Sequence, residues 1–175
     1  MRAVQPSFHL TVARKLSDEL RDSLNPQVTF LGSLGSNLPA WVMNPSINAI
    51  AVRASPAPIQ KGDFVMFMLS HPLAGPKPVN VTKQALCMPG ERIAMIEKPS
   101  KTSHAWDGWY YCNEHLLNVS KPIGRNGMKL DHWQPREGTI PAGLIFVGSN
   151  HPDGFDSRYY GPVAIDRLKR MEKVL

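Results

Sequence analysis

Short apolar runs, separated by proline and glycine, constrain the fold of this chain more than any other feature of its sequence. The runs at 62–69 (GDFVMFML), 92–97 (RIAMIE) and 143–149 (GLIFVGS) have the length of buried strands rather than of helices. Because 16 Pro and 13 Gly punctuate the chain, we predict a mainly β fold of short strands joined by turns. Residues 98–140 carry only weak strand signals and are expected to wrap the sheet, and residues 165–174 are expected to form a short closing helix.

The N-terminal part carries a different pattern. In residues 9–24 (HLTVARKLSDELRDSL) an apolar residue recurs every fourth position from Val12 to Leu24, with charged residues elsewhere on the helical wheel. We therefore predict a helical lead over residues 1–26, followed by one β domain over residues 27–175. The amphipathic helix either packs on its own domain or lies on a membrane or a partner.

Composition places the chain among ordinary globular proteins, with 42% hydrophobic and 19% charged residues. The net charge of +6 fits a solvated basic surface, or attraction to an anionic membrane or to nucleic acid. Since no aromatic-basic pattern accompanies this charge, we expect no nucleic-acid partner. The sequence has no run of 18 apolar residues and no signal-peptide pattern, so these residues alone predict a soluble chain without an export address.

Cysteine and histidine give no sign of a metal centre. Cys87 and Cys112 are the only cysteines, too few for a disulfide framework and not spaced as zinc ligands. They are expected to be small buried residues, or to form one disulfide if the domain faces an oxidising compartment. The six histidines are scattered, without an HExxH or HxxxH pair, so we expect neither a metal nor a cofactor.

A glycine-rich turn offers two candidate nucleophiles. The stretch LGSLGSNLPAWV, residues 31–42, places Ser33 and Ser36 after an apolar run, and Ser36 is preceded by Gly35 and followed by Pro39. A hydroxyl fixed in such a turn can attack a carbonyl, and the backbone N–H of the same residue can face the oxyanion that forms.

A serine nucleophile also needs a base. His151 is the histidine in the most suggestive setting, but Lys83 is the alternative, because burial lowers the pKa of a lysine toward neutrality. Lys83 stands in a strand-like run within VNVTKQALCMPGERI, residues 79–93. Without further information, the same pattern also fits a lysine on an edge strand.

Near the C-terminus, the stretch VGSNHPDGFDSRYYGPVAI, residues 147–165, places charged and aromatic residues between two apolar runs. Pro152 and Gly154 mark a turn. Asp156 and Arg158 follow, so this region is either a surface hairpin with a local ion pair or the supporting wall of a site.

These blocks, taken together and in order, resemble the type I signal peptidase family of Ser/Lys-dyad proteases. The likeness is strongest to its conjugative-transfer branch, the TraF-type pilin-processing peptidases, whose C-terminal signature is similar to HPDGFDSRYYGPV. It covers roughly residues 31–166. The matching blocks are GSNLP at 35–39, KGDFV at 61–65, Lys83 six residues before the Pro-Gly-Glu turn at 89–91, and GSN at 148–150 leading to DSR at 156–158.

The resemblance implies a signal-peptidase/LexA-like β domain and a role for each matched residue. Ser36 matches the nucleophile and Lys83 the general base, with Ser33 as the fallback nucleophile, while Asp156 and Arg158 match the pair that supports the lysine. The implied substrate is a precursor pilin or another signal-peptide-bearing protein, bound as an added strand beside shallow pockets. The acyl-enzyme is then resolved by water or, in the TraF-type branch, by an amine that closes a circular pilin; the sequence does not distinguish the two.

The chain also departs from the family pattern. Leu34 stands where a hydroxyl often helps to bind the oxyanion, Glu91 replaces the usual Asp, and Cys87 stands where Gly or Ala is more usual. Gly154 occupies the position of a serine that commonly contacts the lysine, so the orientation of Lys83 must be provided differently. The family implies the periplasmic face of the inner membrane and an N-terminal anchor, whereas this sequence shows only the amphipathic helix. A missed start, a recruiting partner or a membrane-surface helix would reconcile the two.

Two rival functions follow from the same residues. A LexA-like self-cleaving regulator shares the dyad, but it needs a DNA-binding helix-turn-helix for which the lead is too short. A catalytically impaired peptidase fold that holds a component of a secretion or conjugation apparatus is the second rival, and it is favoured by Leu34 and Gly154.

Overall fold

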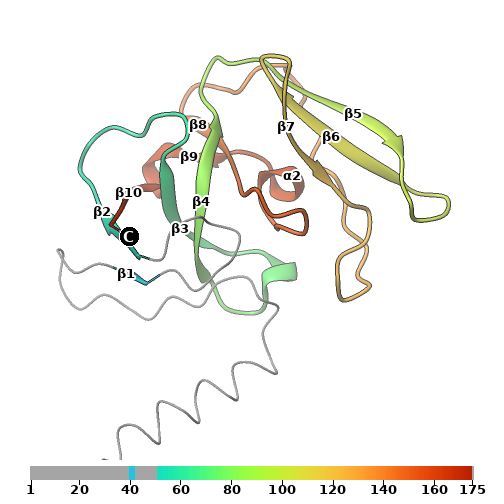
Figure 1. Ribbon diagram of the computed structural model, residues 1–175, viewed down its shortest axis with the longest axis horizontal. Coiled ribbons are helices and arrows are strands. Elements are labelled where there is room, and N and C mark those ends of the chain that lie inside the picture. Colours follow the sequence, from blue (N-terminus) through green and yellow to red (C-terminus); the bar gives the residue numbers. More distant parts are fainter. Residues whose placement is uncertain (1–39, 42–50, 175) are drawn as a thin grey trace, which may run out of the picture.

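The structure is a computed structural model that describes residues 40–41 and 51–174. Within these residues the protein is mainly β, as the sequence predicts, and its helices are single turns (Figure 1). The helix predicted over residues 9–24 and the whole N-terminal lead lie outside the described residues. The strands are β1 (Ala40–Trp41), β2 (Ala51–Ala54), β3 (Phe64–Leu69), β4 (Val79–Cys87), β5 (Ile93–Pro99), β6 (Trp106–Cys112), β7 (His115–Ser120), β8 (Leu144–Gly148), β9 (Val163–Ala164) and β10 (Lys169–Lys173). The helical turns are η1 (Pro72–Ala74), α2 (Ser157–Tyr160) and η2 (Ile165–Arg167).

The larger sheet has seven strands in the described part of the chain, in the order β1-β2-β10-β3-β4-β8-β9. Each neighbouring pair is antiparallel. The side chains of β4 alternate between a buried and a partly exposed face, which is the pattern of a strand with one face on the core. Strand β4 lies between β3 and β8, near the middle of the order.

The end of the chain differs from the prediction. Residues 165–174 do not form a closing helix: the single turn η2 is followed by strand β10, which inserts between β2 and β3. Leu168 and Met171 are buried there, and Lys169 and Met171 pair with residues of β3. The hydrogen bonds and the buried surface that the two neighbouring strands offer therefore override the helical preference of the local sequence.

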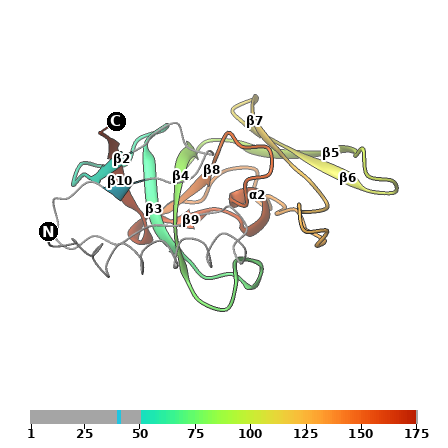
Figure 2. The ribbon, with the colours of Figure 1, turned by 60° about the horizontal axis from the view of Figure 1, so that its bottom comes forward.

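The second sheet is smaller and has the order β5-β6-β7. It projects from the rest of the molecule in both views (Figures 1 and 2). Residues 98–140 hold more strand than their weak signals indicate, because β6 and β7 form a hairpin in their first part. Between β7 and β8 the chain has no named strand. Ile140 of this segment is buried in one hydrophobic cluster with Tyr110 of β6.

Two packed cores result. One lies on the larger sheet around β3, β4 and β8, and the other lies where the two sheets meet. A disulfide joins Cys87, at the end of β4, to Cys112, at the end of β6, with 5.8 Å between the Cα atoms. Of the two sequence-based alternatives for these cysteines, the disulfide is the one found. No helix in the described part of the chain is long and apolar enough to cross a membrane.

Candidate active site

Lys83 lies in β4 and points to its buried face. Lys83 pairs with Val65 of β3, and β8 lies on the other side of β4, so the alternative of an edge-strand lysine is wrong. The side chain is only 1% exposed. Burial disfavours the ammonium form and lowers the pKa of Lys83; the carboxylate of Asp156 opposes this lowering, and the guanidinium of Arg158 adds to it. A lysine in this setting is easier to deprotonate than a lysine in water.

Asp156 and Arg158 form a buried ion pair two residues apart. Arg158 Nε donates to Asp156 Oδ1 at 2.7 Å and Arg158 Nη2 donates to Asp156 Oδ2 at 2.8 Å, a bidentate arrangement. Both side chains are at most 1% exposed. Burial alone would lower the pKa of Arg158, but the charge and hydrogen bonds of Asp156 outweigh it and raise that pKa. The pair predicted from the sequence therefore exists, and it is a buried pair rather than a surface one.

The same ion pair connects the residues next to Lys83, which we call the Asp156–Arg158 wall: Ser149, Gly154 and α2. Asp156 caps α2 by accepting from the Arg158 N–H, and it also accepts from the Ser149 N–H at 3.2 Å. The guanidinium donates to the carbonyl of Val119 in β7 and, at 2.7 Å, to that of Gly154. One ion pair thus ties α2 to the end of β8 and to the smaller sheet.

The nucleophile half of the site is not described. Ser36, Ser33 and Leu34 lie outside the described residues, so their positions relative to Lys83 stay predictions. The described residues bring Lys83 within electrostatic reach of Asp156 and Arg158.

His151 and the two tyrosines have structural contacts. His151 Nδ1 accepts from the Asp153 N–H at 3.1 Å, within the turn. Tyr159 stacks on Phe155 with 5.4 Å between ring centroids, and its hydroxyl accepts from the Lys121 N–H. Tyr160 packs edge-on against the same Phe155 ring. Both rings are therefore part of the packing around the core of the larger sheet.

Glu91 organises the turn that follows β4. It accepts from the Met88 N–H at 2.7 Å and from the ammonium of Lys61 at 2.8 Å. Burial alone would raise the pKa of Glu91, but these partners and Asn113 lower it. Glu91, which stands in place of the usual aspartate, thus has a structural role in this turn.

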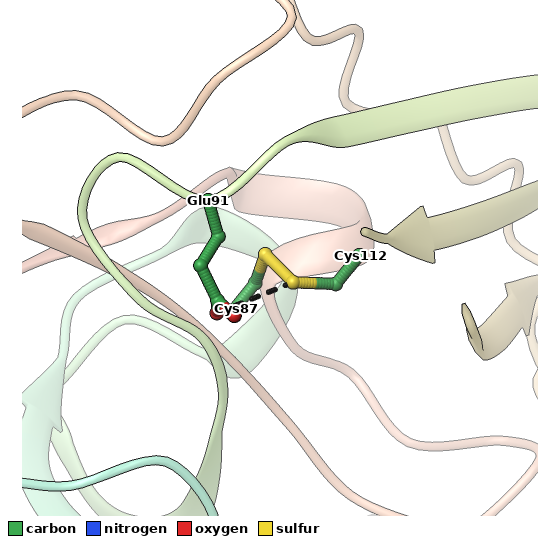
Figure 3. Close-up of side chains that lie close together, drawn as sticks. All are labelled: Cys87, Glu91 and Cys112. Carbon is green, nitrogen blue, oxygen red and sulfur yellow. Dashed lines mark hydrogen bonds between the residues drawn. A yellow bond between two sulfur atoms is a disulfide. The ribbon is translucent and has the colours of Figure 1, made fainter. Parts of the chain in front are cut away.

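Among the described residues, the one candidate for a metal site lies in the same region. Ligand atoms of Cys87, Glu91 and Cys112 lie within 4.8 Å of one another (Figure 3). Both sulfur atoms are joined in the disulfide, and the ammonium of Lys61 lies 3.6 Å from Cys112 Sγ. Thiolates are the ligands a soft cation needs, so this cluster in its disulfide form is a poor fit to a metal.

Some residues of the site region lie in the matched sequence blocks, but the sequence assigns them no role. Ser157 Oγ accepts from the Val147 N–H and so fixes α2 against β8. Ser149 is buried at the end of β8, and Gly154 lies directly against it. Single serines in a turn-rich stretch are too common for a structural role to be assigned before their neighbours in the other strands are known.

A search of the curated proteins found no significant match. The model of the family described as signal peptidase, peptidase S26, matches residues 29–170, which include every residue assigned to the site above.

Proposed function

Because the chain belongs to the signal peptidase family, peptidase S26, we propose that Ser36 and Lys83 form the catalytic dyad of this serine peptidase. Membership in the family makes the protein a signal-peptidase-type serine peptidase whose substrates carry signal peptides. The observation that carries the assignment of the base is Lys83 itself, a lysine buried in the middle of a sheet with its pKa lowered by that burial.

The proposed mechanism follows from the charge state of Lys83. The neutral amine takes the proton from Ser36 Oγ as this oxygen attacks the scissile carbonyl. The backbone N–H of Ser36 helps to hold the oxyanion, and the ammonium of Lys83 then returns its proton to the leaving amine. Asp156 and Arg158 keep the wall beside the lysine in place through their buried ion pair.

The finer assignment concerns the substrate and the compartment. We propose a precursor pilin of a conjugative apparatus, cut on the periplasmic face of the inner membrane, with closure of the pilin into a ring when an amine rather than water resolves the acyl-enzyme. Two observations support this proposal: the HPDGFDSRYYGPV stretch, and the Cys87–Cys112 disulfide, which is typical of an oxidising compartment.

The test incubates the protein with a precursor pilin in lipid vesicles and follows the product by mass. We expect cleavage by the wild type, and a loss of the order of 10⁴-fold or more in Ser36→Ala and Lys83→Met, since nucleophile and base act as a unit. Ser33→Ala and Lys169→Met, the latter an exposed lysine of β10, are the matched controls and should leave cleavage unchanged.

Each outcome separates one part of the proposal. A product lighter by one water than the linear cleaved pilin would establish ring closure, and a linear product would restrict the activity to hydrolysis. Cleavage by Ser36→Ala or Lys83→Met at the wild-type rate would refute the dyad. A wild type that binds the precursor without ever cutting it would favour the impaired, binding form of the fold.

A further inference from the structure

One hydroxyl beside the candidate site is buried without a partner. Ser149 is 2% exposed, and its Oγ is one of three buried side-chain oxygens in the described residues that make no hydrogen bond. A buried hydroxyl without a hydrogen bond costs free energy, so such a group in a folded protein calls for an explanation. Its backbone, by contrast, is held on both sides: the N–H donates to Asp156, and the carbonyl accepts from Asn118 Nδ2 at 2.7 Å.

The strand register places this hydroxyl next to the lysine. Gln84 of β4 pairs with Gly148 of β8, and Ala85 pairs with Val147. One more step along the same antiparallel register sets Lys83 opposite Ser149. Since side chains on a strand alternate between faces, these two follow Ala85 and Val147 onto the buried face of the sheet.

A glycine keeps the space around the hydroxyl free. A Cβ atom on Gly154 would lie 2.3 Å from Ser149 Oγ and 2.9 Å from Arg158 Nη2. A side chain at position 154 and the hydroxyl at position 149 therefore exclude each other. The hydroxyl of Ser149 takes up the space, next to the Asp156–Arg158 wall, that a serine at position 154 would otherwise fill.

We propose that Ser149 is the positioning residue of Lys83, its hydroxyl oxygen accepting a hydrogen bond from the ε-amino group and so aiming the nitrogen lone pair at the nucleophile. The inference rests on the proposed function, because it assigns the partner of the same lysine. In the resting structure Ser149 Oγ makes no hydrogen bond, so its acceptor lone pairs are unused. Catalytic hydrogen bonds often tighten only when substrate is bound.

The charge state of the lysine gives the direction of the expected effect. A hydroxyl oxygen accepts more strongly from an ammonium than from a neutral amine, so the bond favours the charged form of Lys83. In Ser149→Ala the pKa of Lys83 should fall further, and the acid limb of the kcat profile should move to lower pH. At the alkaline plateau kcat should drop on the order of tenfold to a hundredfold with KM unchanged, since the amine is neutral but no longer aimed.

The experiment measures two quantities on the intact protein. One is kcat as a function of pH with the precursor pilin; the other is the titration of the Lys83 amine by NMR with labelled lysine, assigned from its loss in Lys83→Met. Ser149→Thr keeps the hydroxyl and should keep the acid limb in its wild-type position even if its extra methyl lowers the melting temperature. Ser120→Ala is the matched control, a fully buried serine of β7 bonded to Gly108 O and His132, and should leave both readouts unchanged.

The outcomes separate this inference from the proposed function. If the wild type cuts the precursor and Ser149→Ala changes neither kcat nor the titration of Lys83, the inference is wrong and the dyad stands. If the wild type cuts nothing, the dyad fails, while the titration of Lys83 in the protein with the precursor bound still decides the role of Ser149. An acid limb that moves in Tyr160→Phe and not in Ser149→Ala would also overturn it, by giving the role to the other buried, unpaired hydroxyl near Asp156.

Discussion

At the residue scale, the burial of Lys83 lowers the stability of the folded protein while it favours the neutral amine that the chemistry needs. A lysine that is 1% exposed occupies a core position where an apolar residue would be more stable. Its alternation partners on β4, Val81 and Ala85, show what the position otherwise holds. A cost of this kind is common at functional sites, because activity and stability make different demands on a buried position.

This cost predicts that Lys83→Met is more stable than the wild type at neutral pH. Between the lowered pKa in the folded protein and the ordinary lysine value of about 10.4, unfolding takes up a proton, so the free energy of unfolding rises with pH. The advantage of Lys83→Met should therefore shrink as the pH approaches about 10.4. Melting temperatures of the two proteins across this range, with Lys169→Met as control, test it; a variant less stable than the wild type throughout would contradict it.

The buried ion pair should act in the opposite sense. Asp156→Asn keeps the shape of the side chain but leaves the guanidinium of Arg158 buried without its counter-charge. We expect a loss of about 3–5 kcal/mol in the free energy of unfolding, measured by urea denaturation. The control is Glu114→Gln, which breaks a pair with Arg92 whose side chains are 73% and 83% exposed, and which should change nothing measurable. An equal loss in the two variants would show that the burial of the pair is irrelevant.

The sequence predicted these residues because the chemistry leaves a local pattern. Lys83 stands out as a charge in an apolar run, and Asp156 and Arg158 stand out as opposite charges two positions apart beside glycines. Ser149 lies in the matched GSN block, but its role could not be predicted, since what singles it out is its place opposite Lys83, just beyond the end of β8. The roles of Ser36 and Lys83 as a dyad stay predictions, to be tested by the variants above.

At the element scale, the short apolar runs predicted β3, β5 and β8, and local sequence missed a strand that depends on its neighbours. β4 was expected because Lys83 stands in a strand-like run, whereas β10, with the sequence KRMEK, has only Met171 to bury and was mistaken for part of a helix. Its strand conformation depends on β2 and β3, which pair with it from more than 100 residues away in the chain.

The disulfide is the clearest case of a feature that only the fold decides. Cys87 and Cys112 are 25 residues apart and meet because β4 and β6 end at the same place. Closing a loop of this length restricts the unfolded chain, so reduction should lower the free energy of unfolding by about 3 kcal/mol. Urea denaturation with and without reductant measures this loss. The control is Cys87→Ala with Cys112→Ala, whose unfolding should be indifferent to reductant; an unfolding curve of the wild type that ignores reductant would contradict the prediction.

At the scale of the whole molecule, the hydrogen bonds of Arg158 and the disulfide connect the two sheets. Arg158 reaches Val119 in the smaller sheet and Gly154 beside the larger one, while the disulfide joins β4 to β6. Lys83 lies four residues before the disulfide on the same strand. The strand that carries the candidate base is thus tied to both sheets, and general base catalysis requires such a group to stay in line with its nucleophile.

The central claim is that Ser36 becomes acylated with the help of Lys83. The most direct measurement stops the reaction with precursor pilin by acid within the first turnover and locates the acyl group by mass spectrometry of the digested protein. The account predicts an ester on Ser36 in the wild type, formed more slowly in Ser149→Ala and absent from Ser36→Ala and Lys83→Met. An acyl group on Ser33 or on any other residue would contradict it. Complete processing of the precursor by the wild type without any acyl-enzyme, under conditions that slow deacylation, would also contradict it.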